Sequence, residues 1–436
     1  MTLSRKVVRA ALSFADFSPV FSEKTKLLLL DFLSCAYESL DSPQSRQAIQ
    51  VVARAGGGPA SVIGSPVHAS TSEAAFVNAV LGHGLVREDM HTASVSHLGI
   101  VIFPVLLALA QSRKISGRDF IAAAVCGYEV GASFGRALMD HETVRLHRPT
   151  GITGPLGAAV AGSRMLGLSE NAGVSALGIA SNCTVGLNDW AASGADDMFF
   201  HAGFAARNAV TAVELAELGA FASETALDGP AGLFAALRQT DRIATVAPFS
   251  GNPFEILSVY HKPAPACNYA QTACQAALGI GKAIDSADVS DIKVMCSAAA
   301  INYPGCNAAG PFQRVLQAKM SIRFCVAATL TRKSIEENNY RQLADPEIAR
   351  LVSVTKLEED ADFTRAYPGQ QGSEVIVTLR DGKVIRRRMV DLIPATPEQV
   401  HARFRSAAGD RAASIEAMVE SLDQLADVGS LGALLS

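Results

Sequence analysis

One stretch of the chain concentrates side chains that can move protons. It is 82–99, GHGLVREDMHTASVSHLG, and it holds three of the nine histidines and three charged neighbours: His83, His91, His97, Arg87, Glu88 and Asp89. Imidazoles change charge near neutral pH, and carboxylates take up or orient protons. The stretch runs directly into an apolar block, 100–110. Composition alone leaves two interpretations, a proton-transfer loop placed before a buried helix or an ordinary polar connection with solvated histidines.

Four further segments carry cationic or hydroxyl side chains. They contain His147 and Arg148 before a Pro-Thr-Gly turn, His201 at a predicted helix start with Arg207 about two turns on, Lys262 in a proline-rich loop, and Tyr303 just past a predicted strand. Each has a purely structural interpretation as well. A histidine at a helix start can simply cap the backbone, and a tyrosine can fill a core with its hydroxyl bonded.

Taken together, these residues supply complementary roles. Removing a proton next to a carboxylate creates a dianionic enolate, so such a site needs a base and several cations or hydrogen-bond donors, each contributing roughly 3–4 kcal/mol to the transition state. The cationic set comprises His201, Arg207, Arg148 and Lys262. Tyr303 and the loop histidines are candidates for the acid and the base, each contributing roughly 10²- to 10⁴-fold.

Composition narrows the class of protein. The chain has 436 residues, 49% hydrophobic and only 18% charged, with a net charge of -4. This length predicts two domains, and the apolar balance predicts a large core or a buried subunit interface. The sequence has no stripe of basic residues, so nothing in it indicates nucleic-acid binding. The longest apolar run is shorter than the roughly 18 residues of a membrane span, and no signal peptide is evident, so we expect a cytoplasmic protein without a membrane partner. The eight cysteines form no CxxC pair, which favours reduced thiols over a structural metal site.

The pattern of elements predicts a mainly α fold, with a large all-helical domain and a smaller α+β domain. Helical periodicity is found at 24–39, 72–81, 117–139, 154–166, 170–183 and 202–218. Ser116 and Asp119 have the spacing of a capping box. Strand-like runs follow at 291–297 and 351–357, with a helix between them at 317–332 and a hairpin at 374–390, where Asp381-Gly382 suits a type I′ turn. A helical tail covers 397–425. We therefore expect a helical domain of residues 1–250 and 395–436 and an α+β domain of residues 251–394.

An ordered set of motifs resembles the MmgE/PrpD family. The set is GHG, MH, SHLG and FPVLLALAQ, then SGRDFIAAAVCGYEVGASFGRA, HRPTGITGPLGAAVAGSRMLGLS, HAGFAARNAV, YHKPAPACNYAQTA and QAKMSIRF. The family includes 2-methylcitrate dehydratase, cis-aconitate decarboxylase and iminodisuccinate epimerase. The resemblance implies a large helical domain, a smaller α+β lid, a homodimer and a site between the domains. It also implies proton transfer next to a carboxylate of a small polycarboxylate substrate, without a metal or organic cofactor.

The resemblance also carries individual residues over. His97 matches the histidine that ends the family's acidic loop, Lys262 matches the lid lysine, and Tyr303 matches the tyrosine before the QAKMS helix. Members usually read D-x-D-D-T/H ahead of that histidine, and here only Asp89 and His91 stand as equivalents. Arg148 takes the place of a histidine in the family's F-H-P-T segment, with His147 one residue early. A lysine usually found shortly before the segment of His201 is missing. These departures predict a substrate other than 2-methylcitrate or cis-aconitate.

Three hypotheses follow. The first is a lyase of the hydro-lyase type acting on a small di- or tricarboxylate, with epimerisation or decarboxylation as alternative outcomes. In it His97, or His91 oriented by Asp89, is the base, Tyr303 returns a proton, and Lys262 acts with the substrate-binding set: His147, Arg148, His201 and Arg207. The second makes His83, His91, His97 and Asp89 ligands of a metal ion. The third is a non-catalytic helical dimer that binds an anion.

Overall fold

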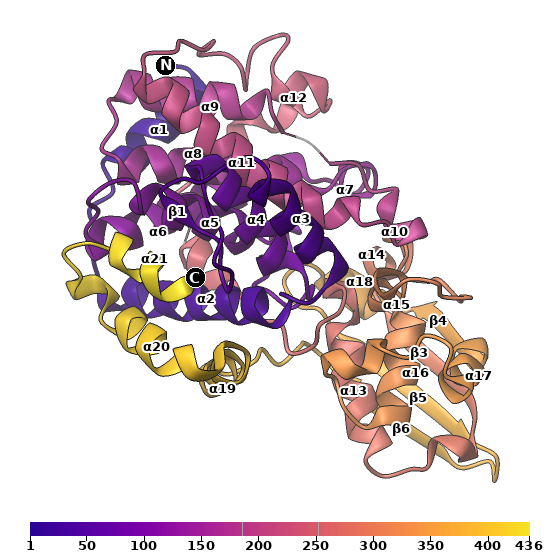
Figure 1. Cartoon of the computed structure of the whole chain (residues 1–436). Coiled ribbons are helices and arrows are strands. Elements are labelled where there is room, and N and C mark those ends of the chain that lie inside the picture. The colour runs from indigo at the N-terminus through magenta and orange to yellow at the C-terminus, as the bar shows by residue number, and fades with distance from the viewer. Residues whose placement is uncertain (185, 252) are drawn as a thin grey trace.

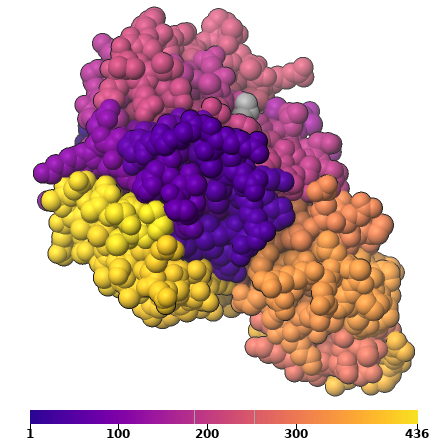
Figure 2. All heavy atoms as spheres, in the orientation of Figure 1, coloured from indigo at the N-terminus to yellow at the C-terminus, as the bar shows by residue number. Residues whose placement is uncertain are grey.

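A computed structural model describes residues 1–184, 186–251 and 253–436. The chain forms a large helical part and a smaller part built on a β-sheet, which lies at the lower right of Figure 1. Figure 2 shows the two parts as separate lobes in contact with each other. The prediction of a mainly α fold with a smaller α+β part is confirmed.

The centre of the large part is α5 (Gly99–Ala110), and every one of its residues is buried. Its sequence, GIVIFPVLLALA, has no polar face, so the helix is stable only when other helices surround it. Those neighbours are α2 (Pro19–Glu38), α4 (Thr71–His83), α6 (Gly117–Leu138), α8 (Pro149–Met165) and α11 (Asp197–Glu217).

Small residues let α6 and α8 pack closely. A Cβ placed on Gly157 of α8 would lie 2.5 Å from the carbonyl oxygen of Gly127 on α6, so only glycine fits there. The predicted cap at the start of α6 is confirmed, because the Ser116 hydroxyl accepts the Asp119 backbone N–H at 3.2 Å, but the Asp119 carboxylate accepts from that hydroxyl at 2.6 Å and not from the Ser116 backbone N–H of a full capping box. A local cap and close helix packing therefore hold α6 and α8 in place beside α5.

The remaining elements of the large part are short or peripheral. They are α1 (Leu3–Leu12), α3 (Pro43–Ala53), the strand pair β1 (Ala60–Ser61) and β2 (His68–Ala69), α7 (Thr143–Leu146), α9 (Glu170–Ser181), α10 (Trp190–Ser193) and α12 (Leu233–Ala236). The C-terminal helices return to this part, with α19 packed against α2 (Figure 1). They are α19 (Pro397–Ala408), α20 (Ala412–Glu420) and α21 (Gly429–Leu435). Among the described residues, no helix is both long enough and apolar enough to cross a membrane.

The smaller part is a four-stranded mixed sheet with strand order β4-β3-β5-β6. The strands are β3 (Val289–Cys296), β4 (Thr355–Glu359), β5 (Ser373–Leu379) and β6 (Val384–Met389). β3 pairs in parallel with β4 and antiparallel with β5, and β5 pairs antiparallel with β6. Its helices are α13 (Gln271–Gly281), α14 (Ala298–Asn302), α15 (Val315–Met320), α16 (Ile322–Arg332), α17 (Pro346–Val354) and α18 (Ala361–Ala366).

Three local predictions in this part need correction. Residues 351–354 end α17 and do not begin a strand, because Asp345 caps that helix through the backbone N–H groups of Glu347 and Ile348. The helix expected at 317–332 is two helices, divided at Ser321, whose hydroxyl caps the second. In the predicted hairpin turn Gly382 alone has a positive φ, 85°. A type I′ turn requires two such residues, so the hairpin closes through a three-residue turn instead.

Candidate active site

A small enclosed cavity lies between the two parts of the molecule. The large part contributes Val86, Met90, Val95, His97, Arg148, Trp190 and Met198, and the smaller part contributes Cys267, Asn268, Tyr269, Tyr303 and Met320. Its volume is about 20 Å³, enough for roughly one water molecule. A dicarboxylate therefore does not fit unless the residues that line the cavity move apart. Three of the predicted residues, His97, Arg148 and Tyr303, line this cavity although they are far apart in the sequence.

His97 lies on the loop between α4 and α5, and its ring Nδ1 has two acceptor partners. The Asp89 carbonyl oxygen is 3.0 Å from Nδ1, and Glu88 Oε1 is 3.1 Å from it. Because both partners only accept, we assign the ring proton to Nδ1. The second nitrogen, Nε2, then carries the lone pair that a general base requires. Burial lowers the pKa of His97 well below its usual value, with Glu88 opposing this effect, so the ring is neutral near pH 7.

Arg148 is a buried guanidinium with no carboxylate partner in the part of the chain that the structure describes. It lies just before α8, where Pro149 occupies the first helical position. Its Nη2 donates to His83 Nε2 at 3.0 Å, its Nε is buried without a partner, and its guanidinium carbon stands 5.5 Å from the centre of the Trp190 ring. Buried charges in proteins are normally paired. An unpaired arginine at a cavity therefore indicates a site for an anion.

Lys262 is a second buried cation close to the cavity. Its ammonium group donates to the Val86 carbonyl oxygen, and Arg403 of α19 holds the lysine loop by donating to the Lys262 carbonyl oxygen at 3.0 Å. Burial lowers the pKa of Lys262, although the nearby Glu88 carboxylate opposes this shift. Within the described residues, the site thus combines two cationic side chains, Arg148 and Lys262, with the Glu88 carboxylate, which leaves a surplus of positive charge for an acidic ligand.

Tyr303 offers a hydroxyl from the smaller part. It is the residue at which α14 ends, so a short helix separates it from β3, contrary to the expectation that it directly follows a strand. Asn188 Nδ2 donates to the phenol oxygen at 3.3 Å, which leaves the phenol proton available to a ligand. Burial raises the pKa of Tyr303 to about 12. The group therefore remains protonated at neutral pH and can act as a proton donor.

His91 and Asp89, which belong to the same polar loop, do not line the cavity. His91 Nδ1 accepts the backbone N–H of Ser94 at 3.3 Å, and its Nε2 is 3.0 Å from Glu255 Oε2. Both ring nitrogens are thus occupied, and His91 is not among the residues that line the cavity. The Asp89 carboxylate accepts from Tyr128 at 2.9 Å, so Asp89 meets His97 only through its backbone carbonyl. The expectation that the Asp89 carboxylate orients His91 as a base has no support in this geometry.

Three residues predicted to bind substrate do not line the cavity either. His201 stands one turn inside α11 rather than at its start, with its Nδ1 buried and unpartnered, and burial together with Arg148 lowers its pKa to about 4. It is close enough to Arg148 for that charge to act on it, but it does not line the cavity. Arg207 pairs with Glu73 at 2.7 Å on a more exposed face, and His147 lines a different hollow. The sequence offered their residue types but could not show which way each side chain points.

The proposed metal site is also at odds with the geometry. His83 Nε2 faces the Arg148 guanidinium, so a cation already occupies the position that a metal ion would need. His91 is committed to Ser94 and Glu255, away from the other two histidines. Within the described residues, the side chains that do gather as potential ligands are His401, Glu416 and Glu420 on α19 and α20. That cluster also holds Arg405, which pairs with Glu416 at 2.7 Å.

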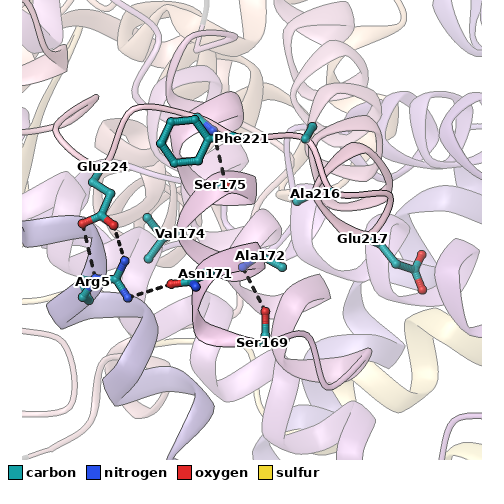
Figure 3. A pocket seen from close by; sticks show the side chains of 13 residues that line it. Arg5, Ser169, Asn171, Ala172, Val174, Ser175, Ala216, Glu217, Phe221 and Glu224 are labelled. Carbon is teal, nitrogen blue, oxygen red and sulfur yellow. Dashed lines mark hydrogen bonds and ion pairs between the residues drawn. The ribbon is translucent and has the colours of Figure 1, made fainter.

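A larger hollow on the helical part, about 420 Å³ in volume, is shown in Figure 3. Its one arginine, Arg5, is neutralised by Glu170 at 2.8 Å and by Glu224. These two carboxylates cancel the positive charge of Arg5. Among the described residues that line this hollow, none therefore offers a free cation to an acidic ligand. The small cavity between the two parts is therefore the better candidate for a reaction site, despite its size.

Sequence reasoning passed over two residues at this site. Glu88 bonds His83 as well as His97, at 2.7 Å between its Oε1 and His83 Nδ1, and Asn188 supports Tyr303. Glu88 stood in the polar loop, but nothing in its spacing separated it from Asp89. Asn188 carried no signal at all, because it follows α9 in an irregular segment whose path is known only from the structure.

The fold and the cavity define a class of protein: two parts, mainly helical, with acid–base groups and buried cations where the parts meet. Comparison with known families agrees. The MmgE/PrpD N-terminal domain matches residues 5–245, and the MmgE/PrpD C-terminal domain matches residues 264–424. The chain belongs to the MmgE/PrpD family.

The chain is also similar to proteins whose names refer to cis-aconitate decarboxylase. A cis-aconitate decarboxylase of Aspergillus terreus is 24% identical, covering 95% of this chain and 91% of that protein. A cis-aconitate decarboxylase-like protein of Aspergillus oryzae is 26% identical over 95% and 92%. The human cis-aconitate decarboxylase is 28% identical over 83% and 79%. The family and these relatives indicate that the protein is an enzyme related to lyases.

Proposed function

We propose that the protein is a lyase that transfers a proton next to a carboxylate of a small di- or tricarboxylic acid, in the cavity between its two parts. The observation that carries the proposal is Arg148, a buried guanidinium without a carboxylate partner that lines the same cavity as His97 and Tyr303. A substrate carboxylate supplies the missing partner, because charge-assisted pairs with arginine are strong and often bidentate.

His97 is the base in the proposed reaction. Its Nε2 removes the proton from the carbon next to the bound carboxylate, and the electron pair moves into that carboxylate as an enolate. Arg148 and Lys262 stabilise the second negative charge, which is the largest contribution expected of a preorganised site. Tyr303 donates its proton to the departing hydroxyl group, so that water leaves and a carbon–carbon double bond forms. Proton return from His97 to Tyr303 closes the cycle.

A second candidate reaction, decarboxylation, is favoured by the relatives, which are named cis-aconitate decarboxylases at up to 95% coverage of this chain. Loss of carbon dioxide leaves the electron pair on carbon, and that carbanion needs a proton from an acid. Tyr303 lines the cavity with a pKa of about 12 and is protonated at neutral pH. The same cations and the same donor therefore serve either reaction.

We test the proposal by incubating the purified protein in deuterated water with hydroxy-di- and tricarboxylates and with cis-aconitate, followed by NMR. A dehydratase forms an unsaturated acid, a decarboxylase releases carbon dioxide and places deuterium on the product, and an epimerase exchanges the α-proton without net loss. The expected result is one of the first two. Absence of all three for every acid, with the protein folded, would contradict the proposal and favour the anion-binding hypothesis.

We also propose that the working form is a homodimer that acts on small molecules alone. Apolar side chains on and just after α11 support it: Phe204, Leu215, Leu218 and Phe221 are 41%, 43%, 85% and 86% exposed. Figure 3 shows Phe221 beside the hollow that contains Arg5. A surface that exposes several large apolar side chains is a candidate interface. Light scattering should give twice the chain mass, and replacing Leu218 and Phe221 with serine should shift the protein toward monomer. A wild-type monomer would refute this part of the proposal.

A further inference from the structure

Among the residues that the structure describes, Glu88 is the carboxylate that touches the proposed base. Its Oε1 lies 2.7 Å from His83 Nδ1 and 3.1 Å from His97 Nδ1, and all three side chains are buried. Its second oxygen, Oε2, is buried without a hydrogen-bond partner. A buried carboxylate shared by two imidazoles is costly to desolvate, so its position calls for a physical reason.

The hydrogen-bond directions in this chain of groups follow from Arg148. A guanidinium can only donate, so His83 Nε2 must accept from Arg148 Nη2, and the His83 proton sits on Nδ1. That proton points at Glu88 Oε1. Glu88 accepts from His97 Nδ1 in the same way. The series Arg148, His83, Glu88, His97 is therefore ordered from the anion site to the base, with every proton placed.

We infer that Glu88 is a positioning residue for the proton transfer, held by His83, and that it keeps His97 in the Nδ1-protonated tautomer and stabilises the doubly protonated ring once the substrate proton has moved. This inference rests on the proposed function and deepens it. The physical role is that of a buried carboxylate behind a catalytic histidine, which orients the imidazole and stabilises the imidazolium without itself taking a proton.

The charges around His97 show why the carboxylate matters. The groups that act on the ring are Glu88 from its own loop, Lys262 from the loop after η3 (Glu255–Ser258), Arg148 from before α8 and His83 from α4. Burial lowers the pKa of His97, and Lys262, Arg148 and His83 lower it further, whereas Glu88 alone among them raises it. Without Glu88, His97 would be too weak a base to hold a proton beside two cations.

Glu88 itself remains ionised. Burial raises the pKa of its carboxyl, but His83, His97 and Lys262 outweigh burial and hold the pKa well below its usual range. The carboxylate charge is thus available to His97 at neutral pH.

Glu255 provides a matched control for Glu88. It is a buried carboxylate with its Oε2 3.0 Å from His91 Nε2, and it does not line the cavity. Glu88→Gln and Glu255→Gln each remove one negative charge from a buried histidine partner while preserving size and one acceptor oxygen. A purely structural effect should appear in both variants, and a catalytic one only in Glu88→Gln.

The first experiment compares the pH dependence of kcat and kcat/KM for the wild type and both variants. For Glu88→Gln we expect kcat to fall by about 10²-fold, and the acidic limb of the profile to move down by about one pH unit or more, because His97 becomes a weaker base. For Glu255→Gln we expect the limb to stay in place. Equal shifts in the two variants, or no shift in Glu88→Gln, would overturn the inference.

The second experiment needs no turnover. Histidine ring ¹⁵N spectra of the wild-type protein, assigned with His97→Asn, report which nitrogen carries the proton. We expect Nδ1 protonation for His97, and an Nε2-protonated His97 would overturn the inference even if the protein proves to be a lyase. If instead no acid is turned over, the expected tautomer can still be present, so failure of the inference and failure of the proposed function are distinguishable.

Discussion

Two histidines of one loop, His97 and His91, make similar contacts with carboxylates yet differ in what they can do. His97 Nδ1 lies 3.1 Å from Glu88, and His91 Nε2 lies 3.0 Å from Glu255. Both rings and both carboxylates are buried. The difference lies in the second ring nitrogen, which for His91 accepts from Ser94 and for His97 is left over beside the cavity.

The backbone of the loop explains this division. His91 and Ser96 form a two-way bridge, with N–O distances of 3.0 Å and 3.3 Å, so these two residues face the same side. Side chains alternate along extended chain, and His97, one residue past Ser96, therefore faces the other side together with Met90. Met90 and His97 both line the cavity. A histidine is available for chemistry when one of its ring nitrogens has no hydrogen-bond partner. Its position in the sequence does not decide this.

The largest effect is expected when the two histidines are replaced one at a time. We expect His97→Asn to lower kcat by about 10³-fold, because general base catalysis contributes roughly 10²- to 10⁴-fold. His91→Asn should retain at least about half of the wild-type kcat while lowering Tm, since it leaves Glu255 partly unpaired. Steady-state kinetics and thermal melts measure both. Equal losses of kcat in the two variants would erase the distinction between the two histidines.

A smaller effect is expected at the proton donor. Tyr303→Phe removes a hydroxyl that receives only the Asn188 amide, so kcat should fall by about 10²-fold with little change in Tm. Tyr37→Phe is the matched control, because its buried hydroxyl donates to the Leu435 carbonyl oxygen at 2.9 Å and Tyr37 does not line the cavity. A Tyr303→Phe enzyme with wild-type kcat would remove this residue from the mechanism.

The surroundings of His97 and His91 also differ in their arginines. Arg148 is buried beside His83 without a carboxylate, whereas Arg136 reaches Glu255 at 2.5 Å and is 41% exposed. We expect Arg148→Met to raise KM by about 10-fold or more, as charge-assisted bonds contribute roughly 1.5–3 kcal/mol. It should also raise Tm, because an unpaired buried charge is replaced by an apolar chain. Arg136→Met should leave KM unchanged. A fall in Tm with KM unchanged for Arg148→Met would show that the arginine is structural.

The mildest effect concerns stability and the Asp89 carboxyl. Burial raises the pKa of Asp89 from 3.8 to about 7 in the folded protein. The folded state therefore holds a proton that the unfolded state releases, so this contribution to stability is full below pH 3.8 and is lost as pH rises toward 7. Asp89→Asn should accordingly raise Tm at pH 8 and leave it nearly unchanged at about pH 4. Denaturation curves across pH measure this, and a uniform change at all pH values would contradict it.

The sequence predicted the helices well because their signals are local. The apolar run of α5 and the Ser116 cap of α6 depend only on nearby residues, and both are present. Errors arose where a local signal was ambiguous. Residues 351–354 are β-branched and apolar enough for a strand, but the Asp345 cap draws them into α17. The boundaries of the two domains remain a prediction.

For the site, residue types could be predicted from the sequence but directions could not. His97, Arg148 and Tyr303 were selected from distant segments, and the structure brings them to one cavity. The roles assigned to them remain predictions. His147 and Arg207 have equal support from the sequence and lie elsewhere, because a step of one residue along a strand or helix turns the side chain to another face. Glu88 was passed over for the same reason.

A crystal structure of the Tyr303→Phe variant with a turned-over acid bound tests the central claim most directly. The account predicts that the two parts separate to admit the acid, that one carboxylate pairs with Arg148, and that the reacting carbon lies about 3–3.5 Å from His97 Nε2. His91 should make no contact with the ligand. An acid bound in the hollow beside His147, or one whose reacting carbon faces His91, would contradict the account.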